Sequence, residues 1–127
     1  MRHLLPHLNQ LIDTYKSAVQ FVFVYIEEAH AIDEWPNPSV NSCITQHRSM
    51  EDRFNAAQKL MTTFSFHSHC KVLLDNINND YNRLLPSWPF RYYIANKGVF
   101  ELKTMPDGDK VSLLQLEEWL SINVNVM

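Results

Sequence analysis

The sequence predicts a mixed α/β fold, and three observations lead to this prediction. Apolar residues recur at three- and four-residue steps in several segments, which indicates amphipathic helices. The run 21–26 is continuously apolar, β-branched or aromatic, as in a strand that is covered on both faces. Helical and extended segments also alternate along the chain instead of forming separate blocks, which is typical of α/β proteins.

The first half of the chain predicts a helix, a strand and a long loop. The helix is expected over 3–18, with Pro6 in its first turn, where a missing N–H costs little. The strand 21–26 follows it. The stretch 27–50 is polar and contains two prolines, so it predicts an irregular segment of the kind that often carries function.

The second half begins with a predicted helix over 51–64, whose apolar face is expected to hold Phe54, Ala57, Leu60, Met61 and Phe64. The remaining expected elements, in order, are a short strand at 71–75, a short helix at 80–85, a hairpin of 91–95 and 99–103 that turns at Asn96-Lys97-Gly98, and a closing helix at 112–120 with Ser112 as N-cap.

Length and composition place the chain in one class of protein. With 127 residues it is expected to form a single domain, 1–127. A net charge of −3 gives no reason to expect nucleic acid as a partner, and two glycines are too few for a Gly-rich phosphate loop. Cys43 and Cys70 are too few for a disulfide scaffold. No apolar run approaches the ~20 residues of a membrane span, so this chain alone is expected to be soluble.

The most informative segment is Tyr25-Ile26-Glu27-Glu28-Ala29-His30, with Asp33 and Trp35 shortly after it. Its carboxylates and imidazole come directly after a predicted strand, and ligands bind at that end of the strands in open α/β sheets. Histidine titrates near neutral pH and can therefore give or take a proton there. The alternative is a solvated strand exit without a chemical role, and the residues alone leave both interpretations open.

Two other patterns are weaker. His67-Ser68-His69-Cys70 offers metal-ligand side chains, but a structural zinc site needs four convergent ligands. The alternative is a loop before a strand, with Cys70 as a small buried residue, and we expect no metal. Cys43 is a candidate resolving thiol, with an ordinary loop cysteine as the alternative.

The run at 25–30 with the following Asp33 and Trp35 resembles the hallmark of the iodothyronine deiodinases. Further similar stretches follow in the same order as in that family and together cover nearly the whole chain: His47 with Glu51-Asp52-Arg53 and Ala56-Ala57, then Cys70–Asp75, Phe90–Ile94 and Leu116–Leu120. The resemblance implies a thioredoxin-like fold of the peroxiredoxin-like variant. It also implies reductive removal of iodide from thyroxine-type hormones, in which a selenolate attacks the iodine.

The resemblance also implies roles for particular residues. Glu28, His30 and His47 fall on catalytic positions of the family, and the two histidines are expected to hold the hormone's phenol end and relay protons. Trp35 falls on a loop tryptophan near the substrate. A carboxylate beside an imidazole is expected to fix its tautomer and raise its pKa.

Three departures from the family pattern stand out. The family's selenocysteine motif precedes the first helix and would lie upstream of Met1, and neither Cys43 nor Cys70 matches its position. Glu34 stands where the family usually has glycine, and a basic residue expected before the last helix has no clear match. We therefore expect a catalytic domain that is N-terminally truncated, lacks its central first strand and is unstable alone. A gene model that read a UGA codon as stop would explain such a start.

The resemblance further implies an external thiol reductant and no bound cofactor, a homodimer, and a membrane anchor that is absent from this chain. Two alternatives to the deiodinase stay open. One is a catalytically inactive thioredoxin-like module that binds a partner or an iodothyronine, and the other is a peroxiredoxin-like thiol or selenol peroxidase.

Overall fold

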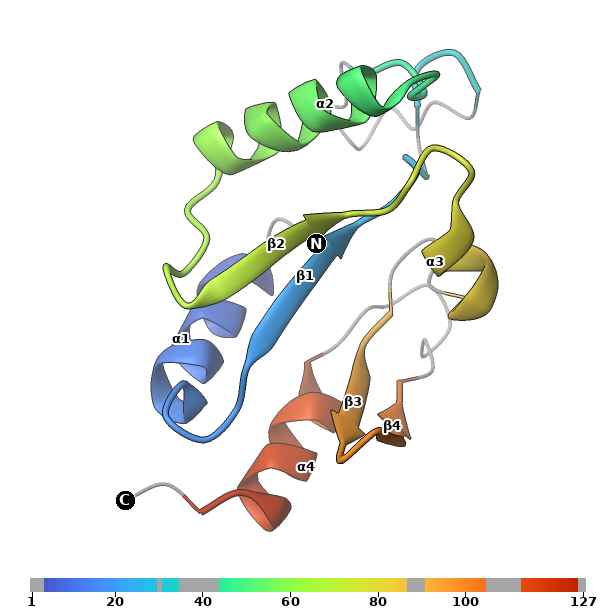
Figure 1. Ribbon diagram of the computed structural model, residues 1–127. Coiled ribbons are helices and arrows are strands. Elements are labelled where there is room, and N and C mark those ends of the chain that lie inside the picture. Colours follow the sequence, from blue (N-terminus) through green and yellow to red (C-terminus); the bar gives the residue numbers. More distant parts are fainter. Residues whose placement is uncertain (1–3, 30, 35–43, 87–90, 105–112, 126–127) are drawn as a thin grey trace. The chain divides into compact units, whose positions relative to one another are not determined.

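The computed structural model describes residues 4–29, 31–34, 44–86, 91–104 and 113–125 (Figure 1). These residues form, in order, α1 (Leu5–Tyr15), β1 (Phe21–Tyr25), α2 (Met50–Thr63), β2 (Cys70–Leu74), α3 (Asp80–Leu84), β3 (Tyr93–Asn96), β4 (Val99–Lys103) and α4 (Leu114–Asn123). The prediction of a mixed α/β protein is confirmed. Every helix and strand expected from the sequence is present, with ends that differ by a few residues.

The strands form two pairs. β1 and β2 make one two-stranded sheet, and their arrows point in the same direction in Figure 1. At the carboxyl end of this pair, the amide of Asp75 donates a hydrogen bond to the carbonyl of Tyr25 at 2.9 Å. β3 and β4 make the second, antiparallel sheet, which is the predicted hairpin.

The hairpin turns through two residues. Asn96 pairs with Val99, so Lys97 and Gly98 form the loop, and both have positive φ angles, of 52° and 80°. A two-residue turn with two positive φ angles matches the right-handed twist of the flanking strands. Gly98 adopts this conformation without strain because it has no Cβ.

The chain divides into two compact units, and the division crosses both β1 and β2. Unit 1 comprises Met1–Val22, Ser65–Lys71 and Phe90–Met127. Its core joins α1 and α4 through buried apolar side chains, against which Phe21, Tyr92 just before β3 and Ile94 within β3 also pack. The buried members of this core are Leu11, Tyr15, Leu113, Leu116 and Leu120.

Unit 2 comprises Phe23–Phe64 and Val72–Pro89 and carries the predicted functional segment. Its core brings α2 onto the ends of β1 and β2, where Tyr25 packs against Ala56 and Ala57. Small alanine side chains let the helix approach the strands closely. α2 begins at a defined point, because the Ser49 hydroxyl accepts a hydrogen bond from the amide of Asp52 at 3.1 Å.

Three sequence-based expectations about packing are wrong. Phe54 and Met61, assigned to the inner face of α2, are about half-exposed. The buried face is instead formed by Arg53 and the two alanines, because the guanidinium finds hydrogen-bond acceptors inside. β1 is not covered on both faces, since Val22 is half-exposed while Tyr25 is buried.

The ends of two helices also differ from the prediction. α1 ends at Tyr15, and the chain then turns through hydrogen bonds from the amides of Ala18 and Val19 to the Tyr15 carbonyl. α4 continues to Asn123, three residues beyond the predicted end. The predicted N-cap Ser112 lies outside the described residues. In the part of the chain that the structure describes, no helix has both the length and the apolar character needed to cross a membrane.

Candidate active site

The candidate site begins where β1 ends in unit 2. Tyr25 is the last residue of the strand, and its hydroxyl donates a hydrogen bond to Oε1 of Glu28, three residues further on. Burial raises the pKa of the Tyr25 hydroxyl, and the hydrogen bond to the Glu28 carboxylate raises it further. Tyr25 therefore stays protonated at physiological pH and acts as a hydrogen-bond donor to the carboxylate.

The Gln46 side chain links the loop to the residues that follow β1 through hydrogen bonds. Its side-chain oxygen accepts hydrogen bonds from the amides of Glu28, at 3.0 Å, and His47, at 3.2 Å. Its side-chain nitrogen donates to the Glu28 carbonyl at 2.9 Å. This amide thus replaces the backbone partners that an irregular segment lacks, and it sets residue 47 beside residue 28.

His47 is the imidazole that the structure places in the site. It is 6% exposed, and its Nε2 lies 3.8 Å from Oε1 of Glu28. Its ring also stacks at a tilt against that of Tyr25, with 5.4 Å between the ring centroids. The phenol of Tyr25 and the imidazole of His47 therefore both lie next to one oxygen of the Glu28 carboxylate. The three residues are spread over 23 positions of the chain.

Arg53 holds the other side of the imidazole. It is 1% exposed, and its Nε–H donates to Nδ1 of His47 at 3.0 Å. Its Nη atoms donate to the carbonyls of Asp75 and Asn76 and to Oδ1 of Asn79. Because a guanidinium only donates, Nδ1 must be the accepting nitrogen, and a neutral His47 carries its proton on Nε2.

The pKa of His47 is lowered to about 4. Burial is the largest cause, because the low-polarity surroundings disfavour the charged ring, and the positive charge of Arg53 adds to it, while Asp52 acts in the opposite direction. The expectation that a neighbouring carboxylate raises the imidazole pKa is therefore wrong for His47. The ring is neutral at physiological pH.

The Nε2–H of His47 is a buried donor without a hydrogen-bond partner among the described residues. Buried polar atoms in native proteins nearly always have a partner, so an exception calls for an explanation, such as a ligand or a water that binds there. In active sites without substrate, catalytic hydrogen bonds are often longer than in the complex. The site can therefore offer an N–H to an acceptor placed next to the Glu28 carboxylate.

The sequence-predicted site residues have different outcomes. The structure brings Glu28 and His47 together, whereas His30 and Trp35 lie outside the described residues, as does Cys43. Sequence reasoning missed the contributions of Tyr25 and Arg53. Both had a signal in the sequence: the tyrosine is the last residue but one of the apolar run that precedes the carboxylates. Arg53 lies three and four residues before a pair of alanines, on the face of α2 that is buried.

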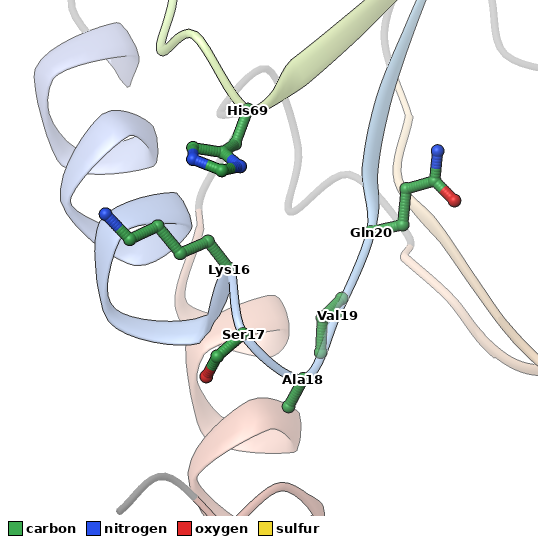
Figure 2. A pocket seen from close by; sticks show the side chains of 6 residues that line it. All are labelled: Lys16, Ser17, Ala18, Val19, Gln20 and His69. Atoms are coloured by element: carbon green, nitrogen blue, oxygen red, sulfur yellow. The ribbon is translucent and has the colours of Figure 1, made fainter.

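The described residues also line two hollows, one beside this network and one in unit 1. One, of about 580 Å³, borders His47 in unit 2 and is lined mostly by polar side chains from the loop and α2. The other, of about 390 Å³, lies in unit 1 where α1 leads into β1. Figure 2 shows that its Lys16 and His69 lie on one side while Gln20 points away on the other, so these groups do not converge.

His67 is engaged on both ring nitrogens. Its Nε2 lies 3.3 Å from Oδ1 of Asp13, and its Nδ1 accepts from the amide of His69 at 3.1 Å. Within the described ranges, no three His, Cys, Asp or Glu side chains gather in a way that could hold a metal ion. The metal-ligand interpretation of this segment thus has no geometric support there.

A buried imidazole, a carboxylate and a phenol, which lie together at the end of this strand, are groups that enzymes use for proton transfer. Comparison with known proteins identifies the family. The family model described as iodothyronine deiodinase matches residues 2–123. The chain therefore belongs to the iodothyronine deiodinase family, and the resemblance recognised in the sequence is confirmed.

Three relatives illustrate the match. The type I iodothyronine deiodinase of Xenopus laevis is 36% identical over 108 residues, which cover 84% of this chain and 41% of that protein. The type II iodothyronine deiodinase of Fundulus heteroclitus is 30% identical over 129 residues, which cover 94% of this chain and 46% of that protein. The thyroxine 5-deiodinase of Ovis aries is 34% identical over 114 residues, which cover 88% of this chain and 37% of that protein. The chain thus spans less than half the length of these relatives.

Proposed function

We propose that this chain supplies the proton-handling part of a reductive iodothyronine deiodinase. The observation that supports this most directly is the group around Oε1 of Glu28, which accepts from the Tyr25 hydroxyl and lies 3.8 Å from Nε2 of His47. The names of the relatives, type I and type II iodothyronine deiodinase and thyroxine 5-deiodinase, support the substrate class.

The reaction explains why such a site is needed. When a ring C–I bond is replaced by C–H, iodine leaves to a nucleophile without the bonding electron pair. That pair stays on the ring carbon, which must take up one proton. The family resemblance implies a selenolate as the nucleophile, and the residues of this chain would then provide the proton and control the phenol end of the hormone.

Glu28 is the proton carrier in this proposal. Its side chain is 20% exposed, so its carboxyl group can exchange protons with solvent. Tyr25 steadies one oxygen through its hydroxyl. His47 cannot fill the same role as easily, because Arg53 occupies Nδ1 and the neutral ring would have to give up its one N–H proton and become an imidazolate anion. His47 instead presents a neutral N–H to an electron-rich oxygen of the substrate.

The finer expectations from the sequence belong to the same proposal. We propose a single thioredoxin-like catalytic domain, with His30 and Trp35 adding contacts to the hormone. An external thiol reductant would regenerate the nucleophile. A homodimer and membrane association follow only from the family resemblance.

The test is iodide release from thyroxine by a full-length version of the protein that carries the proposed selenolate nucleophile, called the intact protein below. We expect Glu28→Gln, which keeps the shape but cannot carry a proton, to lower kcat by about 100-fold or more. Glu101→Gln changes an exposed carboxylate of the hairpin and should leave kcat unchanged. Equal rates for wild type and Glu28→Gln would contradict the proposal.

The same assay separates the two alternatives. Thyroxine binding without iodide release by the wild type would favour the inactive binding module. Reduction of an organic hydroperoxide at a rate above that of thyroxine deiodination would favour the peroxidase.

A further inference from the structure

We propose that Arg53 is the positioning residue of this site: its Nε–H, 3.0 Å from His47 Nδ1, fixes the imidazole as a neutral Nε2–H donor that faces Glu28. The inference rests on the proposed function only in one respect, namely that the Nε2–H donor of His47 serves to bind the substrate. The arrangement of Arg53 and His47 itself follows from contacts that do not involve a substrate.

The Arg53 guanidinium is held in place by hydrogen bonds along its whole length. Arg53 is fully buried in α2, and its donors reach acceptors in three other places: His47, the carbonyls of Asp75 and Asn76, and Oδ1 of Asn79. A planar guanidinium held at its other end by several hydrogen bonds cannot rotate its Nε–H away from the imidazole. The orientation of the His47 ring is therefore set by the packing of α2 on the strand ends.

Arg53 has no carboxylate partner among the residues that the structure describes. No Asp or Glu oxygen forms an ion pair with Arg53 within the described residues, although arginines that are buried this deeply usually have one. The Asp75 side chain is instead used by the amides of Tyr81 and Asn82, at 2.9 and 3.2 Å. The positive charge therefore acts on His47 without being neutralised by a direct partner.

The charged and titratable groups around His47 agree with this role. From α2, Arg53 disfavours a protonated ring and Asp52 favours it. From the β1 end, the Tyr25 ring lies beside the imidazole, and the Glu28 carboxylate faces Nε2. Burial and Arg53 together outweigh Asp52, and the pKa of His47 is lowered to about 4. A purely structural arginine would not need to face a ring nitrogen.

The test is nitrogen NMR of the His47 side chain, with the intact protein labelled with ¹⁵N-histidine and titrated from pH 3.5 to 8. In the wild type we expect one tautomer, protonated on Nε2, at every pH above about 5. In Arg53→Gln the proton affinity of His47 should rise by about tenfold or more, and the tautomers should mix. Arg83→Gln, which removes an exposed guanidinium from α3, should match the wild type.

Arg53→Lys keeps the charge but loses the planar donor, so its tautomers should mix while the rise in proton affinity is smaller than in Arg53→Gln. Its kcat/KM for iodide release should gain a titration of His47 between pH 4 and 7 that the wild type lacks. A wild-type ring protonated on Nδ1 at neutral pH would overturn the proposal, even if no variant folds. An unchanged His47 titration in Arg53→Gln would do the same. Because the NMR readout needs no activity, loss of the proposed function would not affect it.

Discussion

The buried neutral state of His47 predicts a specific dependence of stability on pH. In the folded protein the pKa of His47 is lowered from 6.5 to about 4, by burial first and by the charge of Arg53 second. The unfolded chain exposes the ring to water and restores its ordinary pKa. Between pH 6.5 and pH 4 the unfolded state therefore binds a proton that the folded state does not.

The sign and size of the effect follow from linkage. Stability falls as pH falls through this range, because protons favour the state that binds more of them. A tenfold difference in proton affinity corresponds to about 1.4 kcal/mol, so the free energy of unfolding should drop by about 2–3 kcal/mol from pH 7 to pH 4 on account of this one ring. Above pH 6.5 the contribution is complete and constant.

The assay is urea denaturation followed by circular dichroism at half-unit steps of pH. His47→Gln removes the titrating ring, so the difference between wild type and this variant cancels the carboxylates that titrate in the same range. The difference curve should be flat above pH 7 and fall towards pH 4. The same measurement on His69→Gln, which removes an exposed ring, serves as the matched control for the loss of an imidazole. A flat curve for His47→Gln would refute the reasoning.

Three further predictions concern packing, capping and the tyrosine. Leu120 is 1% exposed in the core of unit 1, so Leu120→Ala should lower the free energy of unfolding by about 2–5 kcal/mol in urea denaturation. Leu114 is 69% exposed on the same helix, so Leu114→Ala should change the free energy of unfolding by less than about 0.5 kcal/mol. Ser49→Ala should lower it by about 1 kcal/mol because the amide of Asp52 loses its acceptor, and an unchanged urea midpoint would contradict the N-cap role. Tyr25→Phe should reduce iodide release by about tenfold or more, since the Glu28 carboxylate loses a donor, and full activity would exclude Tyr25 from the network.

Local sequence patterns were sufficient to predict the elements. The periodicity of α1, the apolar run of β1 and the Lys97-Gly98 turn each reflect a local rule, so their positions could be predicted without tertiary information. The residues on the inner face of α2 could not be predicted in this way. Phe54 is more apolar than Arg53, yet the arginine is buried because carbonyls at the end of β2 accept its hydrogen bonds. Such partners are invisible in a sequence.

The candidate site was predictable in the same limited way. The position of Glu28 after a strand indicated a functional end of the sheet, and family resemblance added His47. The state of that histidine was not predictable, because it depends on the contact with Arg53 and on burial, both of which arise only when α2 packs on β1. The role of Gln46 was equally hidden, since its side chain pairs with a strand exit 18 residues away.

The central claim is that Glu28 and His47 act together on the hormone, and a double-mutant cycle measures this most directly. Iodide release from thyroxine would be compared for wild type, Glu28→Gln, His47→Gln and the double variant, all in the intact protein. We predict that each single variant loses most of the activity and that the double variant is scarcely slower than the worse single one, as expected for groups that work as a unit. Losses that multiply in the double variant, or a His47→Gln enzyme with wild-type activity, would contradict the account.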